Sequence, residues 1–134
     1  MFFKEKIEDM FLIKISALLI HAAKIDENFT KDEQLIIEKT LLKLGANENK
    51  LNQIIEKSKI LEENSNQILD FTREIKNLST KEKINIVESL WKVVYSNKNA
   101  DIYETNLMRR LAGLLYIDNK TMGDIKDKIK NQNL

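Results

Sequence analysis

Apolar residues recur along most of the chain at steps of three and four, with polar positions between them. This spacing places apolar side chains on one face of an α-helix. It predicts a helix over residues 3–25, a second from Thr30 and a short third around residues 51–55. A fourth helix follows a polar break within residues 58–66 and runs to about Leu78, and three more begin near residues 79, 101 and 118.

Helix start and stop signals support these boundaries. Thr30-x-x-Glu33 and Ser79-x-x-Glu82 have the spacing of a capping box, in which two backbone amides at a helix start are satisfied reciprocally. Gly45 supplies a residue suited to the left-handed conformation that ends many helices. The remaining N-cap candidates are Asn47, Asp101 and Asp118.

Composition narrows the fold class. The 134 residues include no proline and three glycines, and 43% of them are hydrophobic. Such a chain is long enough for one ordinary core and has few turn residues for a sheet protein. We therefore predict a single all-α domain over residues 1–134, a compact bundle of about seven short helices. The densest apolar stripe lies in residues 84–94, so we expect that helix at the centre of the core.

The chain contains a weak internal repeat of a helical hairpin. Laying residues 15–45 over residues 86–116 gives five identities. In each copy a polar link is followed, seven residues after its first polar residue, by a glutamate: Asp26 with Glu33, and Asn97 with Glu104.

The two links offer two interpretations. If the hairpins pack side by side, Asp26, Glu33, Asn97 and Glu104 can converge as hard oxygen ligands suited to Ca²⁺, Mg²⁺ or Mn²⁺. Alternatively, both glutamates serve helix caps and helix dipoles, which needs no metal and which spacing alone favours. An EF-hand is excluded because its ligand pattern is missing.

Other functional classes have no support in the sequence. There is no cysteine, nucleophile motif or phosphate loop, so we expect no enzymatic activity. His21 is the only histidine, and we expect it at the edge of the core. Lys and Arg number 22 against 21 Asp and Glu, which predicts no nucleic-acid partner. Charges interrupt the apolar positions of the first twenty residues, so we expect no membrane insertion and a cytoplasmic, soluble protein.

Three arginines stand out in a lysine-rich chain: Arg73, Arg109 and Arg110. Arginine forms two-pronged bonds with carboxylates, so these residues are candidates for ion pairs with the acidic links or for contact with a partner. Trp91 and Tyr95 lie four residues apart, and we expect them to anchor the core.

The second half of the chain resembles the TerB-like family of helical proteins, named for a bacterial tellurite-resistance protein. The residues that carry the resemblance are Leu90-Trp91, Val93-Val94-Tyr95, Tyr103-Glu104 and Arg109-Arg110, together with the segment ALLIHAAKIDENFTKDE in the first half. The resemblance covers nearly the whole chain. It implies an all-α bundle with a hairpin repeat and a role in tellurite or general stress resistance, with use as an interaction domain in some relatives.

The resemblance also implies divalent metal binding by acidic loop residues, which fall on Asp26, Asn97, Glu33 and Glu104. The chain departs from that pattern. Asn97 replaces an aspartate, Glu27 and Lys98 replace the loop glycines, and His21 and Lys92 stand at positions that are acidic in many members. Metal affinity falls with ligand charge. We therefore expect a non-enzymatic module with an unidentified protein partner, and keep a metal-binding sensor or carrier as the alternative.

Overall fold

The computed structural model describes residues 2–24, 30–65, 69–73, 75–96 and 102–132. Within residues 2–8, 69–70 and 102–105 it describes the helical backbone alone. The described residues form helices and the links between them, with no strand. The elements are α1 (Phe2–Ala23), α2 (Lys31–Lys43), the 3-10 helix η2 (Glu48–Lys50), α3 (Leu51–Asn64), α4 (Leu69–Thr72), the 3-10 helix η3 (Ile75–Asn77), α5 (Thr80–Tyr95), α6 (Ile102–Leu114) and α7 (Asn119–Gln132).

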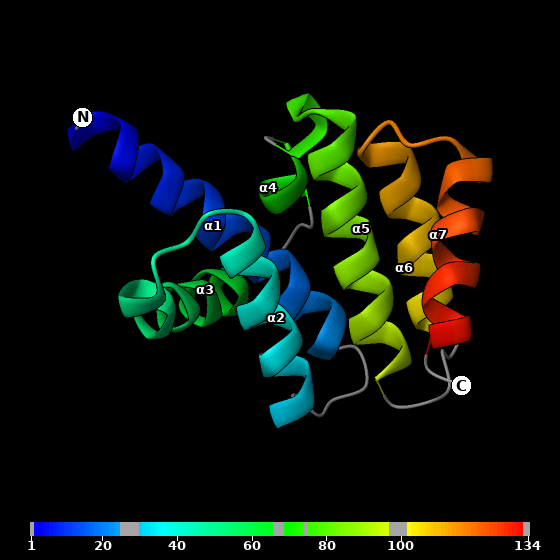
Figure 1. Ribbon diagram of the computed structural model, residues 1–134, viewed down its shortest axis with the longest axis horizontal. Coiled ribbons are helices and arrows are strands. Elements are labelled where there is room, and N and C mark those ends of the chain that lie inside the picture. The colour runs from blue at the N-terminus through cyan, green and yellow to red at the C-terminus, as the bar shows by residue number, and fades with distance from the viewer. Residues whose placement is uncertain (1, 25–29, 66–68, 74, 97–101, 133–134) are drawn as a thin grey trace.

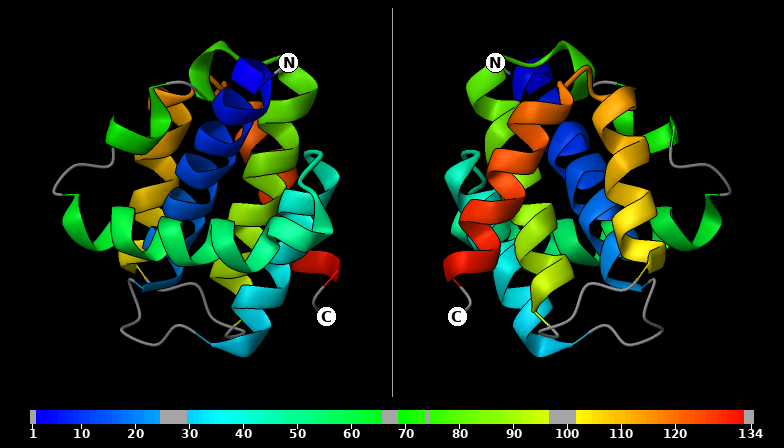
Figure 2. Two further views of the ribbon diagram at one scale, coloured as in Figure 1. Left: turned by 90° about the vertical axis from the view of Figure 1, so that its left-hand side faces the viewer. Right: turned by 90° about the vertical axis from the view of Figure 1, so that its right-hand side faces the viewer.

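The predicted all-α fold is confirmed, with six longer helices and the four-residue α4. Helix α1 packs against α2, α3, α4 and α5, and α5 packs in turn against α2, α6 and α7. Figures 1 and 2 show α3 crossing α1 on one side of the molecule, while α5, α6 and α7 form a second group of helices on the other. No helix in the described part of the chain combines the length and apolarity needed to cross a membrane.

The second half of α1 is buried around its whole circumference. From Ile15 to Ala23 every residue except His21 is buried. A helix that is apolar on all sides has to be enclosed by other elements, and burying one Leu or Ile side chain contributes about 2 kcal/mol. Helix α5 is central to the core, as the sequence predicts, and α1 shares that place.

The start of α2 is built as the sequence predicts. The Thr30 hydroxyl accepts a hydrogen bond from the Glu33 amide at 3.1 Å, and the Glu33 carboxylate accepts one from the Thr30 amide at 2.8 Å. At the other end, Gly45 has a φ of 101°, and the Gly45 amide donates to the Leu42 carbonyl. A left-handed φ of this size favours glycine over residues with a side chain.

The other predicted caps are formed to different extents. The Ser79 hydroxyl accepts from the Glu82 amide, but it also donates to the Glu82 carboxylate, so the reciprocal backbone bond of a full capping box is not the contact made there. Asp118 caps α7 by accepting from the Thr121 amide at 3.0 Å. Bonds from Thr121 hold the pKa of this carboxyl below its ordinary value. The predicted cap Asp101 lies outside the described residues.

The middle of the chain differs in detail from the prediction. Asn47 caps the 3-10 helix η2, which leads into α3. Helix α3 is longer than predicted, but it ends at Asn64, within the stretch 58–66 where the break was predicted. Ser58 inside α3 is buried, with its hydroxyl 2.6 Å from the Ile54 carbonyl oxygen and 3.1 Å from that of Ile13 in α1. The predicted fourth helix is divided into α4 and η3.

We predict that Thr30→Ala lowers the free energy of unfolding by about 1 kcal/mol, the usual effect of losing a side-chain N-cap. The matched control is Thr80→Ala at the exposed first position of α5, where the side chain makes no cap bond. Urea unfolding of both variants measures the difference. Equal effects of the two substitutions would contradict a specific role for Thr30.

Candidate functional site

The ends of both hairpins lie at the same end of the molecule. Helix α1 ends and α2 begins there, beside the end of α5 and the beginning of α6 (Figures 1 and 2). This arrangement agrees with the packing that the repeat predicts. Of the four residues predicted as metal ligands, Asp26 and Asn97 lie outside the described residues, as does the side chain of Glu104. Whether the four converge is therefore still a prediction.

Glu33 is the one predicted ligand whose side chain is described. Only 1% of the residue is exposed, and its carboxylate accepts the Thr30 amide in the capping box. The structural role that spacing favoured is thus present. A buried carboxylate needs such partners because its charge is costly to remove from water. The described residues contain no group of three or more Asp, Glu or His side chains arranged to hold a metal ion.

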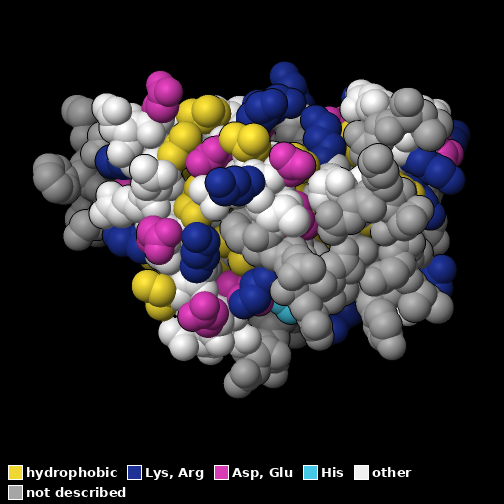
Figure 3. All heavy atoms as spheres, turned by 90° about the horizontal axis from the view of Figure 1, so that it is seen from below, with side chains coloured by type: hydrophobic (Ala, Val, Ile, Leu, Met, Phe, Trp, Pro, Cys, Tyr) yellow, Lys and Arg dark blue, Asp and Glu magenta, His cyan; other side chains and the backbone are white. Residues whose placement is uncertain are grey.

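A polar cluster joins the end of α1 to the end of α3. Glu62 accepts a hydrogen bond from the Lys24 amine at 2.7 Å, and its second carboxylate oxygen lies 3.3 Å from Nδ1 of His21. The Glu62 side chain is 9% exposed, whereas those of Lys24 and His21 are about 40% exposed, at 42% and 39%. Figure 3 shows the histidine among acidic and basic side chains on this end of the molecule.

The contact with Glu62 changes the chemistry of Lys24. The hydrogen bond to Glu62 raises the pKa of Lys24, against a smaller opposing effect of burial. The ion pair therefore stabilises the fold below the ordinary pKa of a lysine and is lost as the pH rises through the higher value in the folded protein. The predicted place of His21, at the edge of the core, is confirmed, and its ring centroid lies 6.5 Å from that of buried Phe71.

No local sequence pattern points to Glu62. It lies 41 residues from His21, and its neighbours in α3 form an ordinary polar stretch. Only the packing of α3 against α1 brings the Glu62 carboxylate to His21. The resemblance to TerB-like chains implies an acidic residue at the position of His21. A carboxylate from another helix thus stands beside the histidine.

The three arginines are exposed, and none makes an ion pair with a residue that the structure describes. Of the acidic link residues that could pair with Arg109 and Arg110, Asp26 and Asp101 lie outside the described residues, and only the backbone of Glu104 is described. Trp91 and Tyr95 are buried and stacked, with ring centroids 5.7 Å apart, and the Trp91 indole nitrogen lies 3.3 Å from the Met122 sulfur in α7. Their predicted role as core anchors is confirmed.

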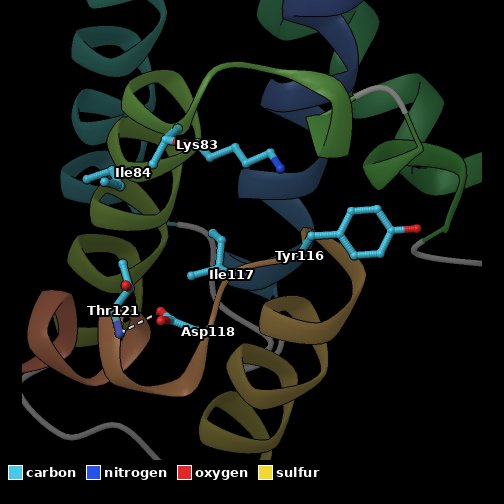
Figure 4. A pocket seen from close by; sticks show the side chains of 7 residues that line it. Lys83, Ile84, Tyr116, Ile117, Asp118 and Thr121 are labelled. Atoms are coloured by element: carbon cyan, nitrogen blue, oxygen red, sulfur yellow. Dashed lines mark hydrogen bonds between the residues drawn. The ribbon is translucent and has the colours of Figure 1, made fainter.

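A cavity of about 330 Å³ lies where the start of α5 meets the turn between α6 and α7 (Figure 4). Tyr116 in that turn is 72% exposed and has a φ of 58°. Figure 4 shows its ring pointing away from Thr121 and Asp118, with the side chain of Lys83 extending toward it, and the Lys83 amine lies 5.8 Å from the ring centroid. Asp118, the carboxylate of this cavity, is already used as the N-cap of α7.

We predict that Glu62→Ala lowers the free energy of unfolding by about 1 kcal/mol, because it removes a nearly buried partner from two groups that are themselves partly exposed to solvent. Glu63→Ala is the matched control, since it removes the same charge from an exposed neighbour in α3. Denaturant unfolding at neutral pH measures both variants. A loss of stability in Glu63→Ala as large as that in Glu62→Ala would contradict the assigned contact.

A comparison with known protein families identifies the family of this chain. The model of the family described as tellurite resistance protein TerB matches residues 12–127, which is most of the chain. Comparisons with curated proteins and with solved structures give no significant match. The matched range contains both hairpins, the capping box of α2 and the cluster around Glu62. The chain belongs to the TerB family.

Proposed function

We propose that this TerB-like domain is a non-enzymatic protein-interaction module that acts in tellurite or general stress resistance. The observation that supports an interaction role is the outer face of α2. Leu35 is 52% exposed and Leu42 is 43% exposed, and their spacing of seven residues places them on one side of the helix. Two large apolar side chains held on one exposed helix face suit a docking surface better than scattered single ones.

The charges around these leucines indicate the partner's chemistry. Three exposed lysines of α2 lie near the same face: Lys31, Lys39 and Lys43. Among the described residues of α2, Asp32 is the acidic residue that is also exposed. A partner helix with two apolar residues one or two turns apart and acidic residues beside them matches this surface. Helices of this kind commonly bind by placing an apolar stripe against a partner's apolar positions. The acidic residues beside the apolar stripe would set the orientation in which the partner helix lies on α2.

We predict that Leu35→Ser combined with Leu42→Ser abolishes function in cells while leaving the fold intact. Substitution of exposed side chains usually changes stability by less than about 0.5 kcal/mol each. Tolerance of the native host to tellurite and to other stresses, with the chromosomal gene replaced by the variant, measures function. Photo-crosslinking from position 42 reports the contact directly.

The matched control is Ile60→Ser, which removes an exposed apolar side chain from α3, where the residue is 58% exposed. This variant should retain both stress tolerance and crosslinking from position 42. Wild-type tolerance in the Leu35→Ser, Leu42→Ser variant, with a normal melting temperature, would refute the α2 surface as the interaction site.

The second candidate function is a divalent-metal sensor or carrier. It draws support from the shared position of the hairpin ends and from the buried Glu33 carboxylate beside them. Glu33, Asp26, Asn97 and Glu104 would supply carboxylate and amide oxygens, which suit Ca²⁺, Mg²⁺ or Mn²⁺. The ion would offset the repulsion between the carboxylates.

For this alternative we predict that millimolar Ca²⁺, Mg²⁺ or Mn²⁺ raises the melting temperature of the wild type by a few degrees, because a ligand of the folded state stabilises it. Thr30→Ala loses part of the cap but keeps the carboxylate, so it should still respond. Glu33→Gln combined with Glu104→Gln should not. No response of the wild type to any of the three ions would exclude this function.

A further inference from the structure

A second cavity, of about 160 Å³, lies between α2 and α5. Its wall contains three lysines, two hydroxyl residues and one isoleucine: Lys39, Lys43, Lys92, Thr40, Ser89 and Ile36. The described residues that line it include no acidic side chain. A water molecule takes up about 30 Å³ in the liquid. The cavity is therefore large enough for a small tetrahedral anion in place of several waters.

The charges at this cavity are unbalanced. Lys39, Lys43 and Lys92 form no ion pair with any residue in the described ranges. The acidic group that acts on the pKa of Lys92 is Glu88, which itself accepts a hydrogen bond from Lys128 at 3.0 Å. Three like charges thus line one small volume whose described lining contains no acidic side chain, and Glu88 offsets them only in part. Such a cluster favours an anion, which lowers the mutual repulsion.

The ionisation of Lys92 reflects this environment. Burial lowers its pKa, and the positive charge of Lys43 lowers it further. Lys128 and Lys39 act in the same direction, while Glu88 opposes them. A negative group placed beside Lys92 would act against both effects and favour its charged form.

The floor of the cavity carries a hydroxyl pair. Thr40 and Ser89 are 3% and 6% exposed, and their hydroxyl oxygens are 2.6 Å apart. Each hydroxyl also lies within hydrogen-bond distance of a carbonyl in its own helix, Ile36 for Thr40 and Asn85 for Ser89. When Thr40 donates to Ser89, the single Ser89 proton is donated to the Asn85 carbonyl, and it would have to turn away from that carbonyl to reach an acceptor in the cavity. By giving up the bond to the Asn85 carbonyl, the pair can supply one neutral donor while Thr40 still donates to Ser89.

We propose that this cavity, which we term the α2–α5 cavity, binds a small multivalent oxyanion of the phosphate type, held by Lys39, Lys43 and Lys92 with the Thr40–Ser89 pair beneath it. Ammonium groups act as point charges toward such anions, and a hydroxyl adds direction. The ligand is either a free inorganic anion or the phosphoryl group of a phosphate monoester. This site is separate from the hairpin ends. It shares Lys39 and Lys43 with the charged edge of the α2 face that carries Leu35 and Leu42, but neither leucine lines it.

The test is a titration of the full chain, labelled with ¹⁵N, followed by the backbone amide signals at constant ionic strength set with chloride. One arm uses inorganic phosphate and the other a phosphoserine peptide. We expect saturable shifts centred on Thr40, Lys43, Ser89 and Lys92 in at least one arm. Binding of inorganic phosphate alone assigns a free anion, whereas binding of the phosphopeptide assigns a phosphoryl group.

Matched variants make the outcome specific. Lys43→Gln with Lys92→Gln should weaken binding about tenfold or more, since it removes two of three charge-assisted contacts. Lys57→Gln with Lys81→Gln makes the same change in net charge at exposed lysines of α3 and α5 and should bind like the wild type. Lys43→Arg with Lys92→Arg keeps the charge and should retain most of the affinity.

Three results would overturn the proposal. One is the absence of saturable shifts in both arms. Another is shifts spread evenly over the molecule, which indicate general salt effects. The third is equal affinity in the Lys43→Gln, Lys92→Gln variant, provided that its amide spectrum shows the wild-type fold.

Discussion

Between Ile15 and Ala23 all residues of α1 except His21 are buried, so this segment has to be surrounded before it is stable in water. Helices α2, α3, α4 and α5 supply that cover. The remaining helices follow from it, because α5 is then left with an apolar side that α6 and α7 cover. Polar contacts are placed where this packing permits them, as with buried Ser58, whose hydroxyl lies near a carbonyl of α1.

Helix α2 connects most of the features that bear on function. Its first turn holds the buried carboxylate of Glu33 in the capping box, its outer face exposes Leu35 and Leu42, and its last two turns supply Lys39 and Lys43 to the α2–α5 cavity. In this 13-residue helix Glu33 lies on a different side from the two leucines, whereas Lys39 and Lys43 lie between the leucine face and the cavity. Substitutions of Glu33, of the two leucines and of Lys92 each change one of these features alone, which allows the proposed functions to be tested separately.

The structure shows what surrounds two residues that depart from the family pattern, His21 and Lys92. His21 stands where many TerB-like chains are acidic, and here Glu62 of α3 brings a carboxylate to within 3.3 Å of it. Lys92 is the second such departure, and it faces the cavity that also receives Lys39 and Lys43. At the first position, Glu62 supplies a negative group near the end of α1. The second concentrates positive charge between α2 and α5, so the two hairpins differ chemically although they share a fold.

The sequence by itself determined the all-α class, the family, and the helix starts at Thr30, Ser79 and Asp118, because caps and apolar periodicity are set by residues three or four positions apart. It did not place Glu62 beside His21, bury Ser58 or gather the three lysines of the α2–α5 cavity. Those contacts join residues about 40 to 50 positions apart, such as Thr40 and Ser89, 49 residues from each other. No local pattern encodes such contacts. They were decided by which faces of α1, α2, α3 and α5 meet when the apolar surface of α1 is covered.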